Sequence, residues 1–134
     1  MIMLPILVTA CSTLGNKGSL YEQLGKQQGI SQLTDAFIEQ IQYDKKILPY
    51  FIESDIERFR EKFIEQICMI SGGPCQYTGD SMAEVHGGMN ISEHHFNALV
   101  EDLILAMESI RLDTATQNQL LDLLVPMRED VIYR

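Results

Sequence analysis

Apolar residues recur at three- and four-residue spacing from Ser19 onward, and no segment alternates between apolar and polar residues with a period of two. This pattern predicts helices joined by turns, and therefore an all-α fold. A short helix is expected to begin at Ser19, with Glu22 completing a capping box, and to end at Gly25. A second helix is predicted over residues 30–43, followed by a tight corner at Pro49.

The middle of the chain changes character after a third predicted helix. Ser54 or Asp55 can cap that helix, and Gly72-Gly73-Pro74 is a strong stop signal for it. Residues 76–90 are rich in Gly and poor in apolar side chains. They predict a loop with one short helical turn over residues 81–86, which something other than side-chain packing must hold in place.

Two more helices are predicted towards the C-terminus. Ser92 is expected to cap a long helix that reaches about Ile110. Asp113 is expected to cap the last helix, in which Pro126 should cause a kink. A length of 134 residues suits one compact domain, which we place at residues 19–134.

Residues 1–18 are expected to form a signal-like segment and a tether. A short apolar run precedes Val8-Thr9-Ala10-Cys11, which resembles the bacterial lipobox, where an acylated Cys becomes the N-terminus after cleavage. That interpretation predicts a lipid anchor on Cys11 and attachment at the periplasmic face of a membrane. Since no Lys or Arg precedes Cys11, a tail ahead of a cytoplasmic domain stays open as the alternative.

Composition and cysteine usage narrow the function classes. Apolar residues make up 46% of the chain and charged residues 22%, which predicts a folded domain. A net charge of −9 without basic clusters argues against a nucleic-acid partner. Cys68 and Cys75 flank the Gly-Gly-Pro turn, so a disulfide is open to them in an oxidising compartment. We favour the interpretation that Cys68 is a buried small apolar residue.

His86 is the most informative residue for chemistry. It lies on a weakly apolar segment between two Gly-rich stretches, and a neutral imidazole is a good ligand for iron. A solvated surface position is the common alternative for a lone His. His94 and His95 are adjacent, so on a helix they point in different directions and are expected to be surface or packing residues.

The order of short motifs resembles that of group I truncated globins throughout residues 19–132. The motifs stand in this order: Ser19 to Gly25, Pro49-Tyr50-Phe51, Gly72-Gly73-Pro74, Tyr77-Thr78-Gly79, Met82, Val85-His86, Ile91 and His95-Phe96. The resemblance implies a two-over-two helical sandwich around haem b, with His86 as the proximal iron ligand, and we expect a monomer. The residues that it places against the haem are Phe51, Phe59, Lys62, Phe63, Tyr77, Met82, Val85, His86, Ile91 and Phe96.

The distal pocket departs from the family pattern. Group I globins usually carry a Tyr on the second helix and a Gln on the third, which donate hydrogen bonds to bound O₂; the matching positions here are Ile38 and Phe63. The residues implied for the distal pocket are Phe37, Ile38, Phe59, Phe63, Gln66 and Ile67. A missing hydrogen bond should cost roughly 1–3 kcal/mol, so tight O₂ storage is not expected. Gln66 is a remaining donor.

Two functions follow from this reading. The first is reversible binding of O₂, NO or CO, with oxidation of NO as a reaction that needs a separate reductase. The second is a six-coordinate electron-transfer or peroxidase-like protein in which Lys62 ligates the iron. The position of Lys62 in the family otherwise pairs with a haem propionate, and ligation needs the neutral amine, which becomes available as pH rises. A cofactor-free helical interaction domain is a third reading, which requires the match around His86 to be accidental.

Overall fold

The computed structural model describes residues 18–86 and 89–132. The lipobox-like prediction for Cys11 therefore lies outside the described residues. The elements are α1 (Leu20–Gln23), α2 (Lys26–Tyr43), η2 (Leu48–Tyr50), α3 (Ile56–Ile70), α4 (Met82–His86), α5 (Glu93–Ser109), α6 (Thr114–Leu124), η3 (Val125–Met127) and α7 (Arg128–Val131). The expected all-α class is confirmed. Within these residues, no helix is long and apolar enough to cross a membrane.

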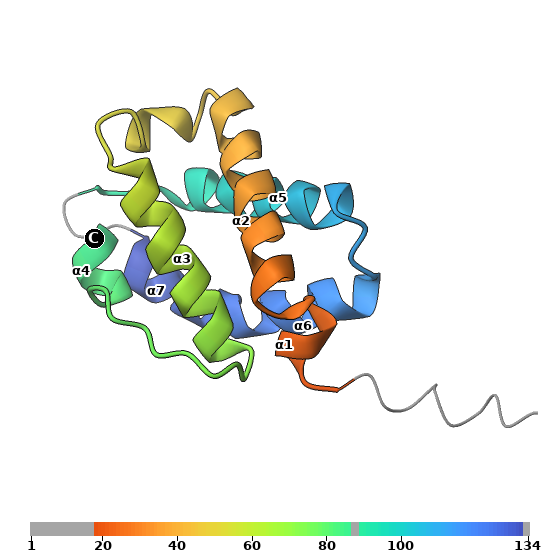
Figure 1. The fold of residues 1–134 in the computed structure, drawn as a ribbon. Coiled ribbons are helices and arrows are strands. Elements are labelled where there is room, and N and C mark those ends of the chain that lie inside the picture. The colour runs from red at the N-terminus through yellow and green to blue at the C-terminus, as the bar shows by residue number, and fades with distance from the viewer. Residues whose placement is uncertain (1–17, 87–88, 133–134) are drawn as a thin grey trace, which may run out of the picture.

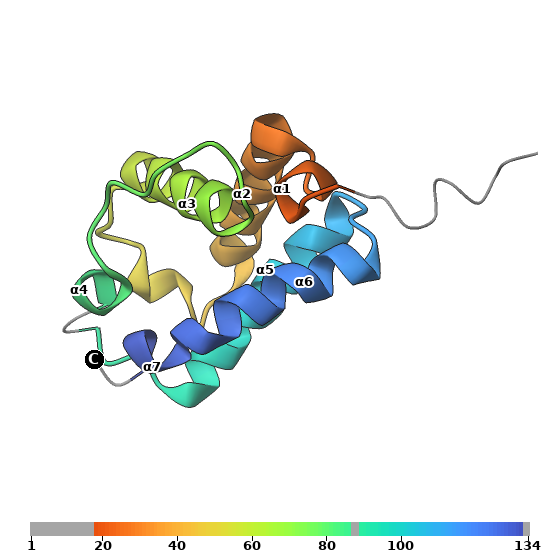
Figure 2. The ribbon, with the colours of Figure 1, turned by 90° about the horizontal axis from the view of Figure 1, so that it is seen from below.

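The long helices form two layers. α2 and α3 lie beside each other in one layer, and α5 and α6 lie beside each other in the other (Figures 1 and 2). α2 packs across α5, and α1 contacts α6 at the same end of the molecule. This is the expected two-over-two arrangement. Between α3 on one side and α4, α5 and α7 on the other, the layers diverge (Figure 2).

Four predicted N-caps are present with their hydrogen bonds. The side chains of Ser19, Asp55, Ser92 and Asp113 each accept from the backbone N–H three residues later, at 2.8–3.2 Å. Such a bond satisfies one of the donors that a helix start leaves free. Of the two candidates before α3, Asp55 is therefore the cap.

Two helix boundaries differ from the prediction. α2 begins at Lys26 rather than near residue 30, because Gly25 adopts φ +93° and starts the next helix directly after α1. The last helix is interrupted rather than kinked. Pro126 lies in a 3-10 turn, η3, and α7 continues the chain after it. Proline has no N–H to donate to the preceding turn, which accounts for the break.

Cys68 and Cys75 form a disulfide, with Cα atoms 5.8 Å apart. Cys68 is fully buried, as expected, but it is not simply a small apolar residue. The bond joins α3 to the loop that follows it. The sequence left this pairing open because proximity across a turn depends on the path of the loop, which local patterns do not fix.

A carboxyl pair lies where α2 meets α5. Asp102 of α5 is 6% exposed, and its Oδ2 has no hydrogen-bond partner among the described residues. Burial, a hydrogen bond to Asp44 and the charge of Asp44 raise the pKa of Asp102 to about 7, against a modest opposing effect of Lys46. Protonated Asp102 thus donates to the carboxylate of Asp44, which also accepts from the Lys46 N–H at 3.0 Å.

Replacing Asp102 should remove a pH dependence of stability. The folded-state pKa lies above the unfolded value of 3.8, so this contribution is fully present below that value and is lost as pH rises towards 7. Asp102→Asn keeps a neutral donor for Asp44. Relative to this variant, the wild-type free energy of unfolding should fall between pH 4.5 and 7.5, as measured by urea titration. Asp122→Asn, on exposed α6 surface, is the matched control, and equal slopes for wild type and Asp102→Asn would contradict the assignment.

Candidate haem site

A cavity of about 390 Å³ opens between α3, α4 and α5. This volume lies in the range of about 300–1,000 Å³ that is typical of ligand sites. All ten residues predicted to contact the cofactor line it: Phe51, Phe59, Lys62, Phe63, Tyr77, Met82, Val85, His86, Ile91 and Phe96. Since these residues come from the end of η2, α3, the loop after it, α4, the chain before α5 and α5 itself, the fold brings together positions that are far apart in the sequence.

Aromatic rings form the wall on the side of α2 and α3. The Phe63 ring lies 5.2 Å from that of Phe37 and 5.7 Å from that of Phe59, between centroids. The Phe51 ring packs edge-on against Phe59 at 5.1 Å. These separations are typical of favourable aromatic pairs. The wall that they form is apolar, as the sequence predicted.

Ile38 and Ile67, which were also expected in the distal pocket, do not line the cavity. Ile67 is fully buried in the main hydrophobic core, and Ile38 is half-buried on α2. Phe37 faces the cavity from α2 instead. Successive helical residues are rotated by about 100°, and here Phe37 points into the cavity while Ile38 lies on an adjacent part of the α2 surface.

Gln66 lines the cavity and has a polar partner beside it. Its Nε2 donates to Sδ of Met127 at 3.5 Å, and Met127 also lines the cavity. A thioether is a weak acceptor. The amide is therefore at the cavity wall with one of its two N–H groups only weakly engaged.

His86 ends the short helix α4 and faces the cavity half-buried. Ser81 starts this helix, accepting from the Glu84 N–H at 3.2 Å. His86 Nδ1 lies 2.7 Å from the carbonyl oxygen of Met82. Because a carbonyl only accepts, Nδ1 must carry the hydrogen. In the neutral ring the lone pair is then on Nε2, which is the form that ligates metals.

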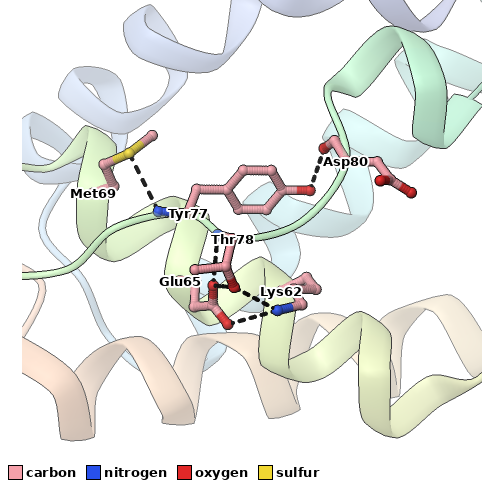
Figure 3. Close-up of polar contacts among 6 residues, drawn as sticks. All are labelled: Lys62, Glu65, Met69, Tyr77, Thr78 and Asp80. Carbon is pink, nitrogen blue, oxygen red and sulfur yellow. Dashed lines mark hydrogen bonds and ion pairs between the residues drawn. The ribbon is translucent and has the colours of Figure 1, made fainter.

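Lys62 does not extend freely over the cavity. Its Nζ donates to Oε2 of Glu65 at 3.1 Å and to Oγ1 of Thr78 at 2.7 Å (Figure 3). The Thr78 hydroxyl and N–H in turn donate to Glu65 Oε1 at 2.6 and 2.9 Å. The Thr78 side-chain and backbone hydrogen bonds, followed by that of Lys62, lower the pKa of Glu65 to about 2. Glu65 is therefore an anion at neutral pH.

Tyr77 precedes this network and has its own partner. Its hydroxyl donates to the carbonyl oxygen of Asp80 at 2.6 Å, and burial, followed by the charge of Asp80, raises its pKa. A Cβ atom at Gly79 would collide with the Tyr77 hydroxyl. The Tyr-Thr-Gly motif is thus explained by a turn that closes on the tyrosine ring.

Sequence reasoning missed a polar pair on the cavity wall. The hydroxyl of Tyr50 lies 2.6 Å from Nδ1 of His95, and both residues line the cavity. The expectation that His95 is a surface or packing residue is therefore incomplete. Local patterns carry no signal for this pair because η2 and α5 are 45 residues apart in sequence.

The cavity suits a flat apolar cofactor with anionic edges. It offers an apolar aromatic wall, the His86 imidazole, whose Nε2 has no hydrogen-bond partner among the described residues, and the cations Arg58 and Lys62 among its lining residues. These donors fit haem, for which a His ligand to the iron and an apolar pocket are the usual provisions. The buried surface of such a cofactor would complete a core that the chain leaves open.

Comparison with known proteins gives the same answer. The profile of the bacterial-like globin family matches residues 19–133. The chain is 25% identical over 114 residues to a group 1 truncated hemoglobin of Tetrahymena pyriformis, covering 85% of this chain and 94% of the relative. It is 33% identical over 89 residues to that of Nostoc sp., covering 66% and 75%.

Solved structures extend the likeness to three dimensions. The truncated hemoglobin of Tetrahymena pyriformis in its Fe(III) form superposes with a TM-score of 0.83 at 25% identity, covering 87% of this chain and all of that chain. The 2/2 hemoglobin of Synechococcus, solved in the cyanomet state with covalently attached heme, shares the fold with a TM-score of 0.81 at 22% identity and the same coverage. The chain belongs to the bacterial-like globin family and is a group I truncated globin, a haem protein that binds diatomic gases.

Proposed function

We propose that His86 Nε2 holds the haem iron from one face, and that O₂, CO or NO binds on the face lined by Phe37, Phe59 and Phe63. The hydrogen bond from His86 Nδ1 to the Met82 carbonyl is the observation that carries this proposal. It fixes both the tautomer and the ring orientation before the cofactor arrives. The haem supplies the ferrous centre to which the gas binds.

The aromatic wall sets the expected ligand preference. Phenylalanine cannot donate a hydrogen bond, so these three rings give no stabilisation to the partial negative charge that O₂ acquires when bound. A missing hydrogen bond of roughly 1–3 kcal/mol corresponds to about a tenfold to hundredfold faster escape of O₂. The amide of Gln66, which also lines the cavity, is a donor that can offset the loss. We therefore propose reversible gas exchange rather than tight storage.

If the chain also oxidises NO to nitrate, the haem that His86 would hold would supply the redox chemistry, and each cycle would need an electron from a reductant. Electrons must come from outside the haem and its ligands. We therefore propose oxidation of NO only for the protein acting with a separate reductase.

The His86→Ala variant should lose the haem–imidazole absorption signature in ferric and ferrous spectra of the purified holoprotein. The physical reason is that the residue removed provides the Nε2 lone pair. His94→Ala, a substitution of an exposed His on α5, is the matched control and should keep the wild-type spectrum. Added imidazole should restore the signature in His86→Ala. An unchanged His86→Ala spectrum would refute the proposed ligand.

Lys62 is the basis of the alternative, a six-coordinate redox or peroxidase-like protein. It lines the cavity, but Glu65 and Thr78 engage its ammonium group. Ligation of iron would require the amine to leave both of these partners. We therefore propose that Lys62 is held at the cavity edge and does not ligate.

The ferrous spectrum tests this directly. We expect a five-coordinate spectrum that stays constant from pH 6 to 10 and is the same in Lys62→Met, because Glu65 and Thr78 hold the Lys62 amine in their own contacts. A six-coordinate spectrum that grows with pH in wild type and is absent in Lys62→Met would instead establish the redox alternative. Glu65→Gln, which weakens the ion pair, is the comparison variant in which ligation should appear first.

A further inference from the structure

Residues 74–81, which we call the connecting segment, run back along α3 and lead into α4 (Figure 1). Tyr77 and Asp80 of this segment line the haem cavity, and His86 follows on α4. The segment is therefore both part of the cavity wall and the near attachment of the proposed proximal helix. Its hold on α3 decides how firmly this side of the cavity is closed.

One attachment of the connecting segment is covalent. Cys75 is bonded to Cys68 of α3, across the turn that contains Gly72 and Gly73. A Cβ atom at Gly73 would approach within 2.7 Å of the Cys68 sulfur and 2.6 Å of the Tyr21 ring. The chain thus passes close enough to α3 at this turn for the bond to form only because residue 73 has no side chain.

The other attachments are hydrogen bonds at partly exposed positions. The Tyr77 N–H donates to Met69 Sδ at 3.5 Å, and Thr78 binds Glu65 and Lys62 (Figure 3). Met69 is 42% exposed, and Thr78 is exposed. Water competes for such bonds, so each one holds the segment weakly. The disulfide is the strongest single constraint on residues 74–81.

The position of the disulfide in the chain limits its effect to the turn and the connecting segment. It joins residues seven apart, so it closes a small loop and restrains the turn and the connecting segment more than the rest of the domain. Cys68 is fully buried, whereas Cys75 is half-buried. An attacking thiolate can therefore reach the bond from the side of Cys75.

We propose that the Cys68–Cys75 disulfide is an exchange site for a dithiol reductant, and that its opening releases the connecting segment from α3 and weakens the closure of the haem cavity. The effect on haem rests on the proposed function. The exchange and the release of the segment do not.

The exchange proceeds in two balanced steps. A thiolate of the dithiol attacks the Cys75 sulfur, forming a mixed disulfide, while the Cys68–Cys75 bond breaks and Cys68 leaves as a thiolate. The second thiol of the reagent then attacks its own mixed-disulfide sulfur and releases Cys75 as a thiolate. The reductant loses two electrons and becomes a cyclic disulfide, and its two protons end on Cys68 and Cys75.

Transfer of ferric haem from the full-chain holoprotein to an excess of a high-affinity acceptor apoglobin measures the closure of the cavity. We compare oxidised protein with protein reduced by dithiothreitol, which is then removed under argon. We expect haem loss to be about tenfold faster after reduction, because a short-loop disulfide constrains the local opening by that order. Cys75→Ser should lose haem as fast as reduced wild type and should not respond to dithiothreitol.

Thr78→Val is the matched control, because it removes the two hydrogen bonds of the Thr78 hydroxyl, to Glu65 and from Lys62, and leaves the disulfide in place. It should keep a clear response to dithiothreitol. Equal haem loss from oxidised wild type, reduced wild type and Cys75→Ser would overturn the role in cavity closure.

Amide hydrogen exchange of residues 76–81 gives a second readout that does not depend on how haem is bound. Reduction should accelerate exchange at Tyr77 and Thr78, whose N–H groups bind α3. If reduction accelerates amide exchange but the His86→Ala spectrum is unchanged, the proposed iron ligand is rejected and the disulfide exchange site is retained. If Cys68 and Cys75 become reactive to a thiol label but amide exchange is unchanged, release of the segment is overturned. If neither cysteine becomes reactive after dithiothreitol treatment, the disulfide exchange site is overturned.

Discussion

The apolar cavity beside α3 is the constraint on which the rest of the structure depends. Phe37, Phe59 and Phe63 face a space that the chain does not fill, and unfilled apolar surface is costly in water. Packing within and between the two helical layers explains the core made by α2, α3, α5 and α6 but not this space. A bound haem supplies the missing apolar surface, so folding and cofactor binding stabilise each other.

The side of the cavity opposite these rings is built from weak local elements. α4 has five residues, too few to be stable alone, and it depends on the Ser81 cap, its contacts with α7 and the connecting segment. The bridge between Ile91 and Ile132 holds the chain after α4 against the C-terminal end. His86 is thus oriented by its bond to Met82, on a helix that depends on polar contacts and on the disulfide of the connecting segment. The wall of Phe rings is held by packing instead.

Local sequence patterns predicted the features that depend on residues close together in the chain. The caps at Ser19, Asp55, Ser92 and Asp113 were predictable because a cap involves residues three apart. Family resemblance supplied the cofactor and the positions that line the cavity. The pairs Tyr50–His95, Asp44–Asp102 and Cys68–Cys75 were not predictable, because they depend on how helices and loops meet. Of the residues expected in the distal pocket, Phe37 lines the cavity, whereas Ile38 and Ile67 do not, because the turn of each helix directs these two side chains elsewhere.

These three pairs tie together elements that surround the cavity. Tyr50–His95 joins η2 to α5, Asp44–Asp102 joins the end of α2 to α5, and Cys68–Cys75 joins α3 to the connecting segment. Tyr50 and His95 line the cavity, whereas neither the carboxyl pair nor the disulfide is among its lining residues, and Ile47 and Leu103 are apolar members of the wall. Buried polar groups that bond to one another cost little, whereas unpaired polar groups against an apolar cofactor would be costly. The rings of Phe37, Phe59 and Phe63 therefore give the cavity wall no donor, and Gln66 is the amide that the chain places among the lining residues.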